Sequence, residues 1–362
     1  MVSISRSSYP RPILTLASSI VSPHVQLASR HRPSRNIFIK DQRAMRRGFV
    51  ERALTVQTHA AARGSEALAV SMGADSKTAD LGGGVRLHYV EKGDAAAPLV
   101  VLVHGFPEFW YCWRKQIPAL AAAGYRVVAM DMRGYNLSCK PTSVEDYAID
   151  ELAGDVHRLI KHLTADKAAG LVGHDWGAAV CWRVAQLHPE SFEKLCILNV
   201  PHPVEFSKGL QSLEQLRKSW YIAAFQIPWI PEALFAALDW KLLRDVFLKD
   251  PDPAYSADDI DEYVYAFQNH PGSMKSAINY YRAAGRALLG GANELLVIDN
   301  PVLVLWGEKD SYLGKEMAVP PPEWVPNATT VFIPGSTHWV TSDAGEEVNR
   351  RLIDFVGGDS FE

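Results

Sequence analysis

Residues 173 to 177 read Gly-His-Asp-Trp-Gly, between a short apolar run at 169–172 and a helical pattern that begins at Ala178. Glycines stand two positions before and two positions after the aspartate, which is typical of a tight, strained turn without room for larger side chains. Such a turn between a strand and a helix projects its central side chain above the sheet edge, as a nucleophile elbow does. Asp175 is therefore a candidate nucleophile. A helix N-cap is the alternative interpretation, because aspartate is common there.

Two later residues favour the nucleophile. Asp310 follows an apolar run at 302–306, and His338 follows another at 330–333. A nucleophile, an acid and a histidine occur here in the chain order that is typical of folds with such an elbow, and each follows a predicted strand. Open α/β sheets place their sites at the carboxyl ends of their strands. We therefore predict that Asp175, Asp310 and His338 form a catalytic triad.

A fourth feature follows the apolar run at 99–103, where residues 104 to 107 read His-Gly-Phe-Pro. At this place the backbone N–H of Phe106 is expected to form an oxyanion hole with the N–H of Trp176. His104, Gly105 and Pro107 are predicted to support it. Glycine and proline so close together are also ordinary turn residues, so a simple turn is the alternative.

The fold class follows from short β-branched runs that alternate with helical patterns from about residue 77 onward. This alternation predicts an α/β fold with a mainly parallel sheet. Several runs are continuously apolar, as in strands that are covered on both faces. The predicted strands are 85–91, 99–103, 126–130, 169–172, 195–199, 302–306 and 330–333.

About a hundred residues between two of these strands contain only helical patterns. Prolines separate the patterns and set their ends. We predict a helical cap at 204–290, inserted before the last two strands and dividing the core into 77–203 and 291–362. The helical patterns cover 213–225, 232–248, 258–268 and 273–289. The rings expected to line an apolar pocket above the nucleophile are Trp220, Phe225, Trp229, Phe235 and Trp240.

The charge distribution divides the 362 residues into two parts. Residues 1–73 hold eleven of the 37 basic residues but only three of the 41 acidic ones, with nine serines in the first 34 positions. This composition predicts a disordered targeting segment for an organelle, the chloroplast in preference to the mitochondrion. A plain disordered tail, a secretory signal and a cytoplasmic protein are the alternatives. The acidic remainder makes nucleic acid an improbable partner.

The sequence also limits partners and cofactors. No apolar run is long enough to span a membrane. The four cysteines lack C-x-x-C pairing or metal-ligand spacing with histidine, so we expect buried reduced thiols, no metal and no cofactor. The oligomeric state, monomer or homodimer, stays open.

Taken together, the motifs resemble those of soluble epoxide hydrolases in the α/β-hydrolase superfamily, from about residue 77 to the end. The resemblance implies a mainly parallel eight-stranded sheet. One departure is Asn136, where the family pattern has glycine; asparagine tolerates positive φ next best. The motifs are H-G-F-P (104–107), D-M-R-G-Y (131–135) with Ser138, G-H-D-W-G (173–177), N-Y-Y-R (279–282), G-E-K-D (307–310) and H-W (338–339).

The resemblance also implies two cap tyrosines that hold the epoxide oxygen. Tyr281 of N-Y-Y-R matches one, and Tyr221, four residues before Phe225-Gln226, matches the other. Tyr280, Tyr263 and Tyr265 are expected to be packing residues.

The implied reaction converts a small apolar epoxide, lipid-derived (an oxylipin) or xenobiotic, and water to a vicinal diol through an aspartyl ester. Three other readings stay open. A haloalkane dehalogenase shares the triad but often has asparagine in place of Phe106. A fluoroacetate dehalogenase has arginine where Trp176 stands. A ligand receptor with this fold would bind without chemistry.

Overall fold

The computed structural model describes residues 64–249, 255–290 and 294–358, and these form an eight-stranded sheet in the order β1-β2-β4-β3-β5-β6-β7-β8. The pairs β1–β2 and β2–β4 are antiparallel, and all other neighbours are parallel. The predicted mainly parallel α/β fold is confirmed. The strands are β1 (Asp75–Asp80), β2 (Arg86–Lys92), β3 (Leu99–Val103), β4 (Arg126–Met130), β5 (Ala168–His174), β6 (Phe192–Leu198), β7 (Val302–Gly307) and β8 (Ala328–Ile333).

The central strands are mostly apolar because helices cover both faces of the sheet. All five residues of β3 are buried. Helices α3 and α14 pack on each other, as do α4 and α5. The helices of the core are α3 (Gln116–Ala122), α4 (Ile149–Leu163), α5 (Trp176–Leu187), α13 (Val340–Asp343) and α14 (Gly345–Gly357). The 3-10 turns are η2 (Trp110–Trp113), η3 (Glu145–Tyr147), η4 (Pro189–Ser191) and η5 (Lys315–Met317).

Strand β1 lies outside the seven strand ranges predicted from the sequence. Its residues, Asp-Ser-Lys-Thr-Ala-Asp, are mostly polar, and Ala79 is the one that is buried. An edge strand with solvent on one face needs little apolar surface, so hydrophobic patterning gives almost no signal for it. The glycines at 82–84 lie between β1 and β2, and all three have positive φ.

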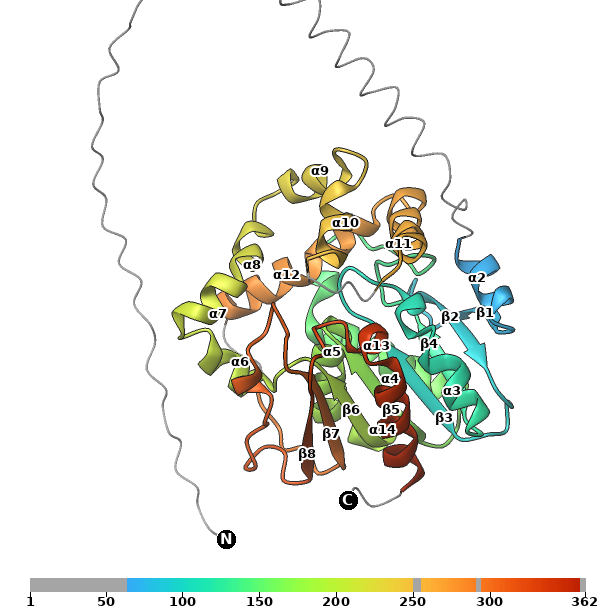
Figure 1. The fold of residues 1–362 in the computed structure, drawn as a ribbon. Coiled ribbons are helices and arrows are strands. Elements are labelled where there is room, and N and C mark those ends of the chain that lie inside the picture. The colour runs from blue at the N-terminus through green and yellow to red at the C-terminus, as the bar shows by residue number, and fades with distance from the viewer. Residues whose placement is uncertain (1–63, 250–254, 291–293, 359–362) are drawn as a thin grey trace, which may run out of the picture. The chain divides into compact units, whose positions relative to one another are not determined.

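The helical cap lies between β6 and β7, over one end of the sheet (Figure 1), as predicted. Two predicted helices are each divided in two. The pattern at 213–225 breaks at Ser219, and the pattern at 232–248 breaks where Leu238, Asp239 and Trp240 have positive φ. Helix α6 was missed. The cap helices are α6 (Pro203–Gly209), α7 (Leu213–Lys218), α8 (Trp220–Ala224), α9 (Ile230–Ala236), α10 (Lys241–Phe247), α11 (Ala257–Asn269) and α12 (Ser273–Gly290).

The predicted boundary at residue 73 needs correction. Helix α2 (Ser65–Ser71) belongs to the folded domain, because Leu68 and Ala69 are buried in the core. Ser65 Oγ accepts hydrogen bonds from the Trp110 indole at 2.7 Å and from Asn136 Nδ2 at 2.9 Å. Only Ser65, Leu68 and Ala69 of this helix are buried, and so few residues gave no hydrophobic pattern that would separate the helix from the basic segment before it. The rest of the predicted targeting segment, residues 1–63, lies outside the described residues.

Among the helices that the structure describes, none is long and apolar enough to cross a membrane.

Candidate active site

Asp175 sits on the turn between β5 and α5 with φ 49° and ψ −126°, a conformation that non-glycine residues rarely adopt. The predicted strained turn is confirmed. Both flanking glycines are required by close packing: a Cβ at Gly177 would overlap the Val103 carbonyl oxygen, and one at Gly173 would overlap the backbone of Ala178. The turn therefore holds the Asp175 carboxylate in one position.

The H-G-F-P segment contacts this carboxylate directly. The Phe106 backbone N–H donates to Asp175 Oδ1 at 2.7 Å. Gly105 allows the approach, because a Cβ there would overlap the Asp175 side chain. His104 is fully buried and its Nε2 accepts from the Met132 N–H at 3.0 Å, while Pro107 is buried beside it. The Phe106 amide thus contacts the Asp175 carboxylate, and the oxyanion-hole role of Phe106 and Trp176 stays a prediction.

His338 lies between the two aspartates. Its Nδ1 is 2.7 Å from Asp310 Oδ2, and its Nε2 is 3.4 Å from Asp175 Oδ2. The side chains of His338 and Asp310 are almost completely buried. The structure therefore brings together the three residues that the sequence singled out, in the order nucleophile, histidine, acid.

Asp310 is held by more partners than the sequence indicated. Its Oδ1 accepts from the backbone N–H groups of Tyr312 (2.7 Å) and Leu313 (2.8 Å). Asn199, which follows β6, donates to Asp310 Oδ2 at 2.7 Å and accepts from the Gly307 N–H at 3.0 Å. Sequence reasoning missed Asn199 as a site residue. Its signal was a polar residue at the carboxyl end of an apolar strand.

The charges of the triad stabilise one another. Burial alone raises the pKa of the Asp175 carboxyl, but the hydrogen bond and charge of His338 outweigh burial and lower that pKa. Burial lowers the pKa of His338, yet the Asp310 charge and the hydrogen bond to Asp175 outweigh burial and raise it to about 10. At neutral pH the unliganded site therefore holds an imidazolium between two carboxylates.

A second buried network lies behind the triad and was also missed. His174 Nε2 is 2.8 Å from the His338 carbonyl oxygen, and His174 Nδ1 is 2.9 Å from Glu108 Oε2. The Tyr255 hydroxyl donates to Glu108 Oε1 at 2.6 Å. The glutamate directly after the H-G-F-P motif gave no indication that it would be fully buried. The network joins the nucleophile strand, the loop of His338 and the cap.

The two cap tyrosines converge near the nucleophile. The rings of Tyr221 on α8 and Tyr281 on α12 have centroids 5.8 Å apart, nearly perpendicular. Burial raises the pKa of both hydroxyls well above the ordinary value, and the negative charge of Asp175 raises each further. Both hydroxyls are therefore fully protonated donors within electrostatic reach of the carboxylate.

Tyr280 differs from its neighbour Tyr281. Its ring is fully buried, and its hydroxyl donates to the Arg133 carbonyl oxygen at 2.6 Å. This contact fits the expected packing role. Tyr263 is likewise fully buried.

Two sequence motifs bind each other to set the tyrosine positions. Gln226 Nε2 donates to the Tyr281 carbonyl oxygen at 3.0 Å. In return, Arg282 donates through Nε to the Phe225 carbonyl oxygen at 3.0 Å. Because these bonds join α8 to α12, the F-Q and Y-R pairs fix the register of Tyr221 against Tyr281.

The predicted apolar lining is correct only in part. Phe225 and Phe235 are buried and pack edge-on against Phe106, beside Tyr281. Trp220 and Trp229 instead are 68% and 72% exposed. Trp220 begins α8 directly after the break at Ser219, and Trp229 directly precedes α9 with positive φ.

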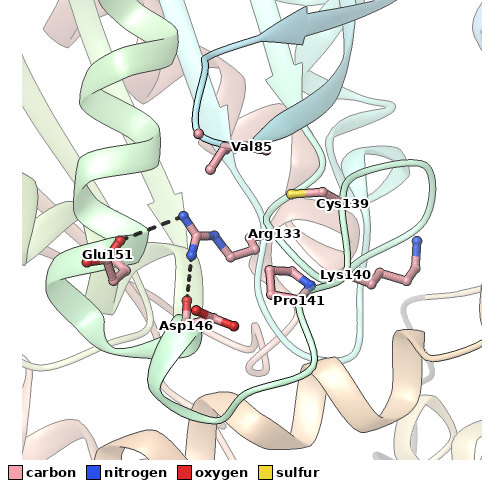
Figure 2. A pocket seen from close by; sticks show the side chains of 9 residues that line it. Val85, Arg133, Cys139, Lys140, Pro141, Asp146 and Glu151 are labelled. Atoms are coloured by element: carbon pink, nitrogen blue, oxygen red, sulfur yellow. Dashed lines mark hydrogen bonds and ion pairs between the residues drawn. The ribbon is translucent and has the colours of Figure 1, made fainter.

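A cavity of about 530 Å³, shown in Figure 2, lies at a different place. Arg133 in its wall already donates to the Asp146 carbonyl oxygen at 2.7 Å. None of the candidate catalytic residues lines it. The lining is Gly83, Gly84, Val85, Arg133, Cys139, Lys140, Pro141, Asp146 and Glu151.

Comparison with known proteins connects this geometry to a family. The model of the alpha/beta hydrolase fold family matches residues 98–344. Epoxide hydrolase 1 of Caenorhabditis elegans is 41% identical over 278 residues, which are 75% of the chain and 68% of that protein. The AB hydrolase superfamily protein YfhM of Bacillus subtilis (strain 168) is 38% identical over 276 residues, 75% of the chain and 95% of that protein.

Solved structures give the same grouping. Epoxide Hydrolase A from Mycobacterium thermoresistibile has a TM-score of 0.66 at 30% identity, over 80% of the chain and 100% of that structure. A mutant epoxide hydrolase from Bacillus megaterium, complexed with its product, a naphthyloxy-propane-1,2-diol, has a TM-score of 0.68 at 32% identity. That match covers 76% of the chain and 98% of the structure.

Proposed function

We propose that this chain, which belongs to the α/β-hydrolase fold family and resembles its epoxide hydrolases, converts an apolar epoxide and water to a vicinal diol. The observation that carries the proposal is the convergence of Tyr221 and Tyr281 near Asp175, which itself contacts a His–Asp pair. A carboxylate supplies the nucleophile, and two protonated phenols supply the hydrogen bonds that a strained ether oxygen needs in order to leave.

The first step forms an ester. An oxygen of Asp175 attacks one epoxide carbon, and the bond from that carbon to the ring oxygen breaks. The ring oxygen takes a proton from Tyr221 or Tyr281, leaving a hydroxyalkyl ester on Asp175 and one tyrosinate. Two donors in a buried site stabilise the developing alkoxide better than one, because little water is present to replace either.

Ester formation also changes the state of His338. In the free site its raised pKa depends partly on the Asp175 charge, and that charge disappears when the ester forms. The imidazolium then loses its proton, which restores the tyrosinate to tyrosine. His338 becomes a neutral base at the moment when a base is required.

The second step cleaves the ester. His338, oriented by Asp310, takes a proton from water, and the hydroxide attacks the Asp175 carbonyl carbon. The Phe106 amide already contacts Asp175 Oδ1, where the oxyanion develops. Collapse breaks the bond between the carbonyl carbon and the alkyl oxygen. The leaving alkoxide takes the hydroxyl proton of the tetrahedral intermediate and departs as the diol, which leaves Asp175 as a carboxylate and His338 as an imidazolium.

The tyrosines separate this reaction from the halide chemistry of dehalogenases. Phenylalanine at Tyr221 or Tyr281 removes one donor to a developing oxyanion, which costs on the order of 3 kcal/mol, roughly a hundredfold in kcat/KM for styrene oxide. Tyr280→Phe is the matched control and should keep the rate near wild type, because that hydroxyl is bonded to Arg133. Equal losses in all three variants, or halide release from haloalkanes without diol formation, would contradict the proposal.

The covalent step can be observed directly. Asp175→Ala should abolish turnover, because no other carboxylate lies at the turn. His338→Gln should form the ester but not cleave it, so the peptide that contains Asp175 should gain the mass of the substrate. An inactive His338→Gln enzyme that carries no adduct would show that His338 acts before ester formation.

A further inference from the structure

A cluster of two histidines and a glutamate lies outside the active site. His157 is on α4, His188 ends α5, and Glu190 is in η4. Each offers a ligand atom within 4.8 Å of the other two, and within the described residues this is the one group of three or more histidine, cysteine or carboxylate ligands with such spacing.

We propose that His157, His188 and Glu190 form a binding site for a divalent transition metal ion of the zinc class. Two imidazoles and one carboxylate are a common ligand set for zinc with three protein ligands, and the fourth position is left to water. Magnesium and calcium prefer oxygen ligands, so the two nitrogens disfavour them.

The distances suit a small metal ion. Glu190 Oε1 is 3.9 Å from His157 Nδ1 and 3.8 Å from His188 Nδ1, too far for hydrogen bonds. Zinc lies about 2.0 to 2.2 Å from such ligands, so tetrahedral ligands are roughly 3.4 Å apart. The carboxylate oxygen is therefore already within about half an ångström of the spacing that zinc ligands need.

The rings must also turn before they bind a metal. The two imidazoles are stacked with centroids 3.9 Å apart, whereas a metal takes a lone pair in the plane of each ring. Both side chains are about a quarter exposed and can rotate into solvent. Ser191 Oγ lies 2.6 Å from His157 Nδ1, and this hydrogen bond has to break if that nitrogen becomes the ligand.

Two further features favour a bound cation. His188 stands at the C-terminal end of α5, where the free carbonyl groups carry partial negative charge. Glu190 adds a negative charge beside both rings, with Oε1 3.9 Å from His157 Nδ1 and 3.8 Å from His188 Nδ1. The cations near His157 are Arg158 and Lys161, which oppose binding and favour a site of moderate affinity.

The place of the site indicates a structural role. Glu190 lies two residues before the amino end of β6, whereas Asp175 directly follows the carboxyl end of the parallel neighbour β5. The two sites are thus at opposite ends of the sheet. A metal here would join α4 to the turn between α5 and β6, raising stability without entering the reaction.

Untagged full-length protein tests the proposal, with Co²⁺ titrated by visible absorption and Zn²⁺ by calorimetry. Wild type should bind one more ion than His157→Asn or His188→Asn, and its cobalt complex should show the d–d absorption of a low-symmetry site. Loss of either ring should weaken the metal affinity of this site by more than about tenfold. Zn²⁺ should raise the melting temperature of wild type and of a control variant that keeps the site, but not of His157→Asn or His188→Asn. The matched control is His162→Asn, which removes an exposed histidine from the same helix.

Two results would overturn the proposal. The first is an unchanged isotherm and cobalt spectrum in folded His157→Asn and His188→Asn proteins. The second is an equal loss in His162→Asn. Diol formation by each variant reports that the fold is intact, because none of these histidines belongs to the proposed reaction.

Discussion

Removing the charge of Asp175 should convert His338 from an imidazolium to a neutral base. Asp175→Asn keeps the size of the side chain but removes its charge, as ester formation does. The Asp175 carboxylate oxygen lies 3.4 Å from His338 Nε2. At an effective dielectric constant of about 20, two charges at this distance attract by about 5 kcal/mol. That energy corresponds to a few thousandfold in proton affinity.

The assay is an NMR titration of the histidine ring signals in both proteins. In wild type the His338 pKa should be about 10, so the ring stays protonated across the neutral range. In Asp175→Asn that pKa should fall into the range of an ordinary histidine, although Asp310 still contacts Nδ1. His202 serves as the internal reference, because burial lowers its pKa to about 4 and the triad is not among the causes.

A His338 that remains protonated above pH 9 in Asp175→Asn would refute this reasoning. Asp310 alone would then hold the proton, and esterification could not release the base. The proposed coupling between the two half-reactions would be lost, although the nucleophile assignment would stand.

Two further predictions concern stability. Deleting residues 1–63 should leave the melting temperature and activity unchanged. Deleting residues 1–73 also removes α2 and should lower stability. Within that helix, Leu68→Ala truncates a buried side chain and should lower the free energy of unfolding in urea by about 2 to 5 kcal/mol. A full-stability 1–73 deletion would show that α2 is dispensable. Because folding raises the His338 pKa, its contribution to stability should be complete below pH 6.5 and lost as pH rises through about 10. Urea unfolding of wild type and His338→Gln across this range measures the contribution, and parallel curves would contradict it.

In the core, local sequence patterns predicted the strained turn, several strands and the residues that follow them. Glycines two positions on either side of Asp175 implied a strained turn, and the turn has positive φ. Apolar runs predicted β3 and β4 with their bounds. Because parallel strands end at one edge of the sheet, residues that follow such runs, Asp310 and His338 among them, had to lie close together. These inferences need only the chain neighbours of each residue.

The cap required tertiary structure. Its helices break at Ser219 and at 237–240, and no proline marks either break. Leu238, Asp239 and Trp240 have positive φ there, which the residue types alone did not indicate. Trp220 and Trp229 face solvent, although their hydrophobicity alone favoured a buried pocket. Which face of a short helix is buried depends on the part of the protein against which the helix packs.

The supporting residues of the site also depended on distant partners. Asn199 acts through Asp310, and Glu108 through His174, across separations of 111 and 66 residues. Helix α2 was hidden for the same reason, because Ser65 is recognised as part of the fold only through Trp110 and Asn136. The sequence by itself determined the strands and the residues that their carboxyl ends present. Tertiary structure decided which buried polar groups satisfy them, since a hydrogen bond between distant segments leaves no periodic trace in either one.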